Sequence, residues 1–177
     1  MHDAGPNDST AVAPMDKPLR WLWLAAAVVV LDLGTKALMS SLLTYAQPVE
    51  VLPFFNLTLL HNTGAAFSFL AGHPGWQRWL FALVAVGASI GLTLWMRRLK
   101  SDERLLAASL ALLIGGALGN LYDRLVHGYV VDFLSFHMAG WYYPAFNVAD
   151  IGITLGAIGL IWESVFEGRK QARRRRG

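Results

Sequence analysis

Hydrophobic residues are gathered in four long runs along the chain, with polar or mixed segments between them. The runs cover residues 19–38, 76–96, 105–122 and 146–165. Each is close to the roughly 20 residues with which an α-helix crosses about 30 Å of hydrocarbon. Four such runs leave too little of the chain for a soluble core. The pattern therefore predicts an all-α integral membrane protein with four transmembrane helices.

The composition agrees with this interpretation. Of the 177 residues, 55% are hydrophobic and 15% are charged, whereas an average soluble domain has about 25% charged residues. The chain has no cysteine, which excludes a disulfide framework, a thiolate metal site and a cysteine nucleophile.

The positions of the basic residues predict the orientation. Of the 15 Lys and Arg residues, all but Lys36, Arg78 and Arg124 lie before or at the very start of the first run, between the second and third, or after the fourth. Cytoplasmic loops carry the excess of Lys and Arg in membrane proteins. Both termini are therefore expected in the cytoplasm, and segments 39–75 and 123–145 outside. The net charge of +3 then reflects topology and attraction to anionic lipid, not nucleic-acid binding.

These features divide the chain into three parts. Residues 1–18 form a polar leader, residues 19–166 a single four-helix domain, and residues 167–177 a basic tail. The first run is long for a signal-peptide core and no small-residue cleavage site follows it, so we expect it to remain as a span. In the outer segment 39–75, apolar and polar residues partly alternate over residues 49–60, which predicts a short strand.

Pairs of small residues recur at helical spacing within three of the runs. Such pairs let helices approach each other closely in lipid, and we expect packing at all of them. Residues 87–91 also match the G-x-S-x-G nucleophile elbow, but that motif needs a strand–turn–helix context. The pairs are Gly87 and Gly91, Gly115 and Gly119, and Gly152 and Gly156.

Four acidic residues have no surface explanation. An ionisable group at membrane depth costs at least about 2.5–3.5 kcal/mol at a helix centre and indicates a functional site. The four lie at the outer ends of the runs or in the segment between the third and fourth runs. They are Asp32, Asp123, Asp132 and Asp150.

Asp132 and Asp150 flank one short outer connection in apolar surroundings. Asp150 shares a helix face with Asn147, where a carboxylate is either a helix cap stabilised by the dipole or a functional group. Two carboxylates within about 3 Å cannot both ionise. One can then take a proton from water while the other protonates a scissile carbonyl. The pair is therefore a candidate aspartic-protease dyad, and spacing alone leaves the cap interpretation open.

Other polar residues lie near the same end of the predicted bundle. Asp32 and Lys36 have the i, i+4 spacing of a structural ion pair. Asp123 and Arg124 are candidates for a structural ion pair or for pairing across the outer connection. Segment 61–67 is a polar loop with small residues that can present backbone groups to an extended peptide.

At these residues the chain resembles the lipoprotein signal peptidases (signal peptidase II), a family of bacterial inner-membrane aspartic proteases. The resemblance covers residues 19–163 and rests on five motifs in the same order. In this family a Gln commonly follows the first-run Asp, where this chain has Leu33. The motifs are Asp32…Lys36, Asn62-Thr63-Gly64-Ala65-Ala66-Phe67, Gly119-Asn120…Asp123-Arg124, Val130-Val131-Asp132-Phe133 and Phe146-Asn147…Ala149-Asp150.

The resemblance implies an aspartic endopeptidase that removes signal peptides from prolipoproteins by cleaving before a diacylglyceryl-modified cysteine. It implies Asp132 and Asp150 as the dyad, without a metal or other cofactor. A small extracytoplasmic β-cradle, a short periplasmic helix and a lid are expected in the outer segments. Membrane lipids are the other expected partners, and a monomer is the simplest assembly. Supporting or substrate-binding roles are expected for Asn62, Gly64, Asn120, Asp123, Arg124 and Asn147, together with Asp32 and Lys36.

Three other interpretations fit parts of the pattern. A small transporter or channel component that relays protons would favour carboxylates near mid-membrane and paired repeats, whereas here the carboxylates cluster at one end and no repeat is visible. A polyaspartyl intramembrane protease requires a Gly-x-Gly-Asp motif and more spans. A metalloprotease requires a motif such as His-Glu-x-x-His, which the chain lacks.

Overall fold

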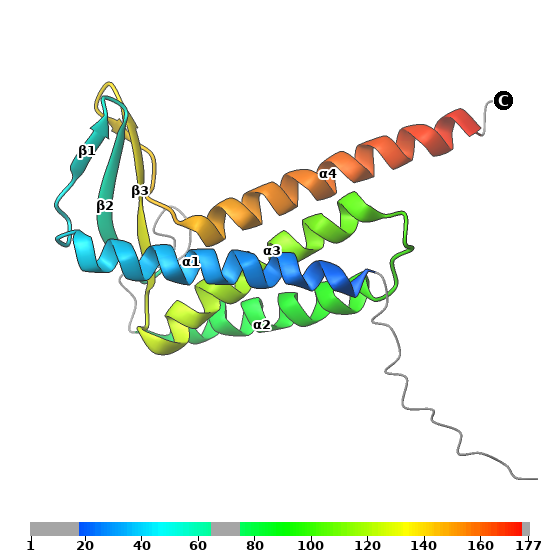
Figure 1. Cartoon of the computed structure of the whole chain (residues 1–177), viewed down its shortest axis with the longest axis horizontal. Helices are drawn as coiled ribbons and strands as arrows, with labels where there is room; N and C mark the ends of the chain where they lie inside the picture. The colour runs from blue at the N-terminus through cyan, green and yellow to red at the C-terminus, as the bar shows by residue number, and fades with distance from the viewer. Residues whose placement is uncertain (1–17, 65–74, 175–177) are drawn as a thin grey trace, which may run out of the picture.

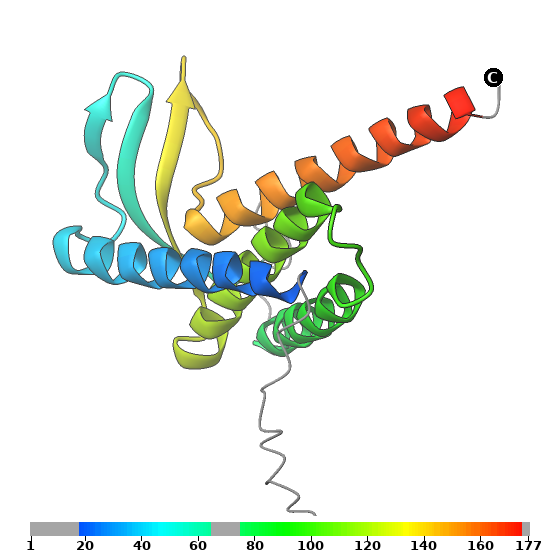
Figure 2. The same cartoon turned by 45° about the vertical axis from the view of Figure 1, so that its right-hand side comes forward.

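The computed structural model describes residues 18–64 and 75–174, with side chains described as far as Phe166. Four long helices extend away from a small sheet that lies at one end (Figures 1 and 2). A 3₁₀ turn, Leu19–Trp21, leads into the first helix. The helices are α1 (Leu22–Leu42), α2 (Trp76–Met96), α3 (Arg104–Val126) and α4 (Val148–Arg174). The strands are β1 (Val49–Leu52), β2 (Phe55–Asn62), β3 (Val130–Met138) and β4 (Trp141–Tyr142).

Each of the four helices is long and apolar enough to cross a membrane. None contains a proline, so the backbone hydrogen bonds continue through each span. The spans cover Leu19–Leu42, Trp76–Met96, Arg104–Val126 and Val148–Phe166, within a few residues of the predicted runs. The chain is a multi-pass membrane protein with a small antiparallel sheet, as predicted.

Helix α3 is the centre of the bundle and contacts the other three helices. Its most apolar window is 56% buried inside the protein, against 17–22% for the other helices. Small residues permit this packing. A Cβ added to Gly115 would lie 2.7 Å from the carbonyl oxygen of Ala25, and one added to Gly156 would lie 2.7 Å from that of Ser109. The predicted packing of the glycine pairs in α3 and α4 is confirmed.

The glycine pair of α2 behaves differently. A Cβ added to Gly87 or Gly91 would meet no described heavy atom within 4 Å. The predicted packing at this pair is therefore wrong for the described parts of the chain. The reason is the rotation of α2 about its axis, which turns Ala82, Ala85 and Ser89 inward and buries them.

The sheet has the strand order β1-β2-β3-β4 and is antiparallel throughout. The pairing of β2 with β3 shifts between Leu57 and Leu60, because β2 has one extra residue in this interval. Directly opposed residues point to the same side of a sheet, so this bulge turns Asn62 to the side that carries Asp132. The strand predicted over residues 49–60 is present as two paired strands.

One predicted element is not found among the described residues. Between Leu43 and Gly64 the chain forms loops and strands, and the described residues contain no short helix at the sheet end of the molecule. Residues 65–74, which belong to the segment where a lid was predicted, lie outside the described residues.

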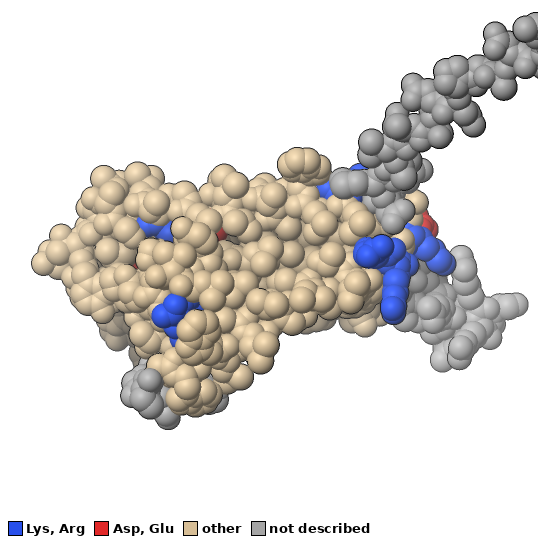
Figure 3. Space-filling view, turned by 90° about the horizontal axis from the view of Figure 1, so that it is seen from below, with Lys and Arg blue, Asp and Glu red and all other residues tan. Residues whose placement is uncertain are grey.

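Basic residues gather at one end of the molecule, whereas exposed tryptophans lie at both ends, with Trp23 and Trp95 at the basic end. Figure 3 shows most of the visible Lys and Arg at the end opposite the sheet, with a nearly uncharged surface between. The α2–α3 connection contributes exposed Arg97, Arg98 and Lys100. Exposed Trp76 begins α2 and exposed Trp141 lies in β4, at the other end. An apolar belt with tryptophans at both boundaries and basic residues at one of them is typical of a membrane-spanning body.

Candidate active site

The two candidate catalytic aspartates lie in elements that are held together by backbone pairing. Asp132 lies in β3, and Asp150 lies in the first turn of α4. The N–H of Phe146 donates to the carbonyl of Leu134 at 3.0 Å, and its carbonyl accepts from the N–H of Leu134 at 2.9 Å. This pairing places the next residue, Asn147, beside Asp132 and starts α4 there.

Asn147 caps α4 and orients Asp150. The side-chain oxygen of Asn147 accepts a hydrogen bond from the N–H of Asp150 at 3.0 Å, and Oδ2 of Asp150 accepts one from the N–H of Asn147 at 3.3 Å. The two residues thus form a reciprocal capping box. Asp150 can therefore serve both as a helix cap and as a functional group. Its Oδ2 takes part in the cap, and its Oδ1 is left to face the site.

Asp132 is buried among side-chain amides and is only 3% exposed. Its Oδ1 accepts a hydrogen bond from Nδ2 of Asn147 at 2.7 Å, and its Oδ2 accepts one from Nδ2 of Asn62 at 3.1 Å. Burial, followed by the negative charge of Asp150, raises the pKa of Asp132 from its ordinary value of 3.8 to about 7. Asp132 therefore holds a proton in a large share of molecules at neutral pH.

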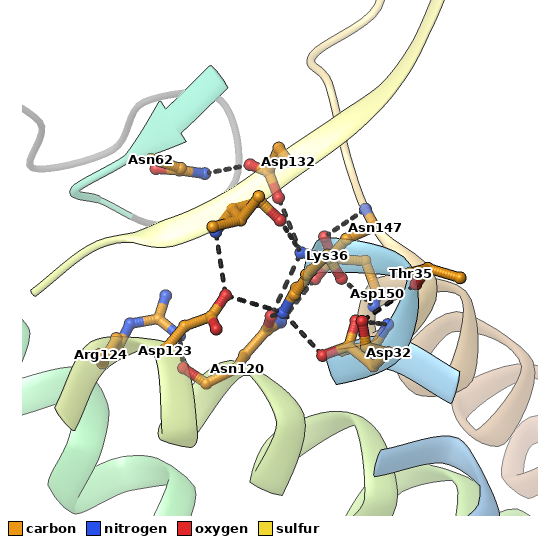
Figure 4. Close-up of polar contacts among 12 residues, drawn as sticks. Asp32, Thr35, Lys36, Asn62, Asn120, Asp123, Arg124, Asp132, Asn147 and Asp150 are labelled. Carbon is orange, nitrogen blue, oxygen red and sulfur yellow. Dashed lines mark hydrogen bonds and ion pairs between the residues drawn. The ribbon is translucent and has the colours of Figure 1, made fainter. Parts of the chain in front are cut away.

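Asn120 completes the link between the two aspartates. Its Nδ2 donates to Oδ1 of Asp150 at 2.8 Å, and its Oδ1 accepts a hydrogen bond from Nδ2 of Asn147 at 3.2 Å. A continuous chain of hydrogen bonds therefore runs from Asp132 through Asn147 and Asn120 to Asp150 (Figure 4). The fold brings the candidate dyad and these two predicted supporting residues together.

Behind these residues lies a buried ionic cluster, formed by Asp32, Lys36 and Asp123. The Nζ of Lys36 lies 2.7 Å from Oδ2 of Asp32 and 3.0 Å from Oδ2 of Asp123. The i, i+4 pair is thus present as expected. Asp123 pairs with Lys36, and no ion pair joins Asp123 to Arg124 in the described parts of the chain. Adjacent helical residues point about 100° apart, so Asp123 and Arg124 face different sides of α3.

Arg124 points toward the end of β2. Its Nη2 donates to the carbonyl of Gly64 at 3.2 Å, and its guanidinium lies 5.2 Å from the ring centroid of Phe81. The N–H of Gly64 donates to Oδ1 of Asn62 at 3.0 Å. Arg124 and Gly64 thus hold the side chain of Asn62 in place. The remainder of this motif, residues 65–67, lies outside the described residues.

The site opens into a cavity of about 630 Å³ that is lined by both Asp132 and Asp150. Ile151, Thr154 and Leu155 continue its wall along α4. Their i, i+3, i+4 spacing is a signal that sequence reasoning missed. Other lining residues carry no such signal, because loops bring them to the site; they include Tyr45 and Tyr143.

The histidines near the site stack on a tyrosine. The rings of His61 and Tyr129 have centroids 4.0 Å apart, and those of His127 and Tyr129 are 5.8 Å apart. Burial, followed by the charge of His127, lowers the pKa of His61. Within residues 18–64 and 75–166, no group of three or more histidine or acidic side chains is placed to hold a metal ion.

Comparison with known families identifies the chain. The family model described as signal peptidase (SPase) II matches residues 24–166. The chain belongs to the signal peptidase II family. It is therefore a protease of this family, and the resemblance predicted from the five motifs is confirmed.

Individual relatives support the same family assignment. A lipoprotein signal peptidase of Yersinia pseudotuberculosis serotype O:1b (strain IP 31758) is 51% identical over 154 residues, which cover 84% of this chain and 91% of the relative. A lipoprotein signal peptidase of Yersinia pestis (strain Pestoides F) has the same identity and coverage.

Two solved structures share the fold. Both are described as bacterial membrane enzymes solved by the in meso method. The structure at 2.3 Å resolution has a TM-score of 0.76 and 30% identity, and covers 84% of this chain and 89% of its own. The structure at 1.9 Å resolution has a TM-score of 0.70 and 31% identity, and covers 80% of this chain and 90% of its own.

Proposed function

We propose that this signal peptidase II is an aspartic endopeptidase that removes signal peptides from diacylglyceryl-modified prolipoproteins by cleaving before the lipid-modified cysteine. Family membership supports the substrate class, because the relatives are named lipoprotein signal peptidases. One observation carries the chemistry: Asp132 and Asp150 line the same cavity and are joined by bonded amides. The chain itself has no cysteine, so the cysteine at the cleavage point belongs to the substrate.

The two aspartates take different roles in the proposed reaction. Asp150 lies in the first turn of α4, where the partial positive charge of the helix N-terminus stabilises a carboxylate. Asp132, with a pKa of about 7, carries the proton. We assign Asp150 as the base that takes a proton from water and Asp132 as the acid that protonates the scissile carbonyl oxygen.

The second half of the reaction restores both groups. When the C–N bond of the tetrahedral intermediate breaks, Asp150 passes the proton it took from water to the leaving amine. Asp132 takes a proton back from a hydroxyl of the intermediate as the new carboxyl group forms. The dyad then has its starting protonation, so the net reaction consumes one water molecule and needs no other reactant.

The surroundings of the dyad fit a peptide that carries a lipid and an apolar helix. Leu134 and Phe136 lie on the same side of β3 as Asp132, which gives an apolar strip leading toward the tip of the sheet. The cavity also extends along α4 past exposed Ile151 and Leu155. Both surfaces favour a substrate that enters sideways from the bilayer and lies across the sheet as an extended peptide.

We further propose the orientation of the enzyme in the bacterial inner membrane. The basic connection between α2 and α3, the leader 1–18 and the tail 167–177 would lie in the cytoplasm. The sheet and the dyad would lie at the periplasmic boundary, where water is available. A monomer is the simplest assembly, because α3 is covered by helices of its own chain. Membrane lipids would contact the exposed faces of the other helices.

The decisive experiment measures cleavage of a diacylglyceryl-modified precursor by Asp132→Asn, Asp150→Asn and wild-type enzyme. Each variant is expected to accumulate in the membrane but to lose at least about 1000-fold in rate, because the dyad acts as a unit. Glu50→Gln, which changes an exposed carboxylate of β1, is the matched control and should cleave normally.

Two further readouts belong to the same experiment. Cleavage should resist a chelator, and its rate should fall as pH rises through about 7, because Asp132 must hold its proton. Normal cleavage by either aspartate variant would exclude the dyad. Loss of cleavage with the chelator would favour a metalloenzyme.

A further inference from the structure

The buried ionic cluster of Asp32, Lys36 and Asp123 is hydrogen-bonded to the backbone next to both aspartates of the dyad. Oδ1 of Asp32 accepts a hydrogen bond from the N–H of Ala149 at 2.8 Å, and Oδ2 of Asp123 accepts one from the N–H of Val131 at 2.9 Å. Ala149 and Val131 each directly precede one of the two aspartates of the dyad. Each carboxylate of the cluster therefore anchors the backbone one residue before one dyad carboxylate.

Lys36 joins the two carboxylates that anchor the backbone, those of Asp32 and Asp123, which we call the backbone anchors. An ammonium group has three N–H donors and no acceptor. That of Lys36 faces three oxygen atoms: Oδ2 of Asp32 at 2.7 Å, Oδ2 of Asp123 at 3.0 Å, and Oδ1 of Asn120 at 3.0 Å. Lys36 is buried, so its donors have no competing partner in bulk water. Figure 4 shows it between the two anchors and Asn120.

Asn120 is the third partner of Lys36, and it also contacts the dyad. The groups that face its Oδ1, the Nζ of Lys36 and the Nδ2 of Asn147, are both donors. They fix the amide with its oxygen toward the cluster, so its Nδ2 points to Oδ1 of Asp150 at 2.8 Å. The ammonium therefore determines which way the amide presents itself to the dyad.

We propose that Lys36 is a positioning residue for cleavage: its ammonium holds the two backbone anchors and Asn120 together, and thereby fixes the spacing and orientation of the dyad carboxylates. The inference rests on the proposed function, because it presupposes that Asp132 and Asp150 perform the cleavage. Lys36 is not among the described residues that line the cavity, so it acts through its partners and does not touch the substrate.

The charge of Lys36 provides an independent readout. It lowers the pKa of Asp132, against the effects of burial and of Asp150. Loss of the ammonium should therefore raise the pKa of Asp132 and move the alkaline limb of activity to higher pH. The other charged or titratable groups around the dyad lie in all the surrounding elements. They are Asp32 of α1, Asp123 and Arg124 of α3, Asp150 of α4, and His61, Tyr45 and Tyr143 at the cavity wall.

The test uses the full-length enzyme with two variants. Lys36→Met removes the ammonium and leaves two buried carboxylates unpaired. The double variant Asp32→Asn/Lys36→Met removes one negative and one positive charge together, so the cluster keeps its net charge, and an amide oxygen remains for the N–H of Ala149. Thr35→Val is the matched control, because Oγ1 of Thr35 donates to the carbonyl of Leu31 in its own helix at 2.7 Å.

The double variant is expected to accumulate as a monodisperse protein. Its kcat should fall about 100-fold, since a displacement of about 1 Å at reacting groups has an effect of that size. Its KM should stay within about threefold of the wild-type value, and its alkaline limb should lie at higher pH. Lys36→Met should show the same changes with a lower folded yield, and Thr35→Val should match the wild type.

Two results would overturn the inference. In the first, folded Lys36 variants keep the wild-type kcat and pH profile. In the second, neither variant accumulates while Asp132→Asn does, which would make Lys36 a folding residue. Failure of the proposed function looks different, because Asp132→Asn and Asp150→Asn would then cleave normally. If those two are inactive and the Lys36 variants are unchanged, only the positioning role is excluded.

Discussion

Asp132 and Asp150 line one cavity, yet the fold holds them in opposite ways. Asp132 lies within a strand, is buried, and accepts hydrogen bonds from two side-chain amides. Asp150 lies in the first turn of a helix and closes a capping box with Asn147. A helix N-terminus stabilises negative charge, whereas an antiparallel sheet has only a small net dipole because the dipoles of its strands alternate.

This difference separates the two carboxyl groups chemically although they are the same residue type. Burial and a neighbouring negative charge raise the pKa of Asp132, whereas Asp150 lies at a helix N-terminus. The secondary structure around each group therefore supports the acid and base roles proposed above. Three substitutions test this difference between the surroundings of Asp132 and Asp150.

Among the residues that support the dyad, Asn147→Ala should have the largest effect, because this residue contacts both aspartates. The change removes the hydrogen bond to Oδ1 of Asp132 and the cap of α4. We expect kcat to fall about 1000-fold and the free energy of unfolding to fall by about 2 kcal/mol. Kinetics and thermal unfolding in detergent measure the two effects.

The matched control for this change is Asn56→Ala. Asn56 is also a buried amide, but it lies on the other side of β2 and its Oδ1 is 3.1 Å from Nε2 of His137. The control should keep its activity within about threefold. A loss of less than tenfold in Asn147→Ala would show that the two aspartates do not depend on a shared amide.

Asp132→Asn should change stability in a direction that depends on pH. The pKa of Asp132 in the folded protein, about 7, lies above its ordinary value of 3.8, so ionisation lowers the stability of the wild type as pH rises from about 4 to 7. The variant removes this penalty, at most about 4 kcal/mol. The variant also loses about 1 kcal/mol of stability at every pH. Its amide has one acceptor oxygen, whereas two donors, the side-chain amides of Asn62 and Asn147, face this position.

Asp132→Asn should therefore be less stable than the wild type at pH 4 and more stable at pH 8. Asp150→Asn removes only the charge near Asp132, which is a smaller cause of the raised pKa than burial. Its gain at pH 8 should be smaller. Thermal unfolding at the two pH values checks both predictions. If Asp132→Asn were more stable than the wild type at both pH values, or less stable at both, the proton proposed on Asp132 would be contradicted.

Asn62→Ala should have the smallest effect of the three, because Asn62 donates a hydrogen bond to Asp132 but not to Asp150. Its hydrogen bond lowers the pKa of Asp132, so its loss should move the alkaline limb of activity to higher pH. We expect a rate about tenfold lower at neutral pH. The pH profile of kcat/KM measures this, with Ser135→Ala, a buried polar residue of the same sheet, as the control. A shift to lower pH would exclude the proposed proton position.

Local patterns were sufficient to predict the elements and to propose candidate residues for the chemistry. Membrane thickness sets the length of a span, so four apolar runs yielded four helices with nearly correct ends. Carboxylates beside apolar runs stand out because their burial is costly, which singled out four aspartates. The short connection between two of them then made Asp132 and Asp150 the candidate dyad. The alternation over residues 49–60 was likewise enough for a strand prediction.

Contacts between elements could not be predicted in this way. Gly87 and Gly91 have the same spacing as Gly115 and Gly119, yet one pair faces away from the bundle and the other packs. Asp123 stands next to Arg124 in the chain but pairs with Lys36 of another helix. Spacing within a helix says which residues share a face, and it does not say which way that face is turned.

The amino-acid sequence therefore determined the number of spans, their limits and the candidate dyad, because hydrophobicity and the cost of buried charge act locally. The tertiary structure alone decided that Lys36 joins both backbone anchors and that a bulge in β2 turns Asn62 to Asp132. The physical reason is that the rotation of a helix and the register of a strand are set by packing against distant residues, which no short segment contains.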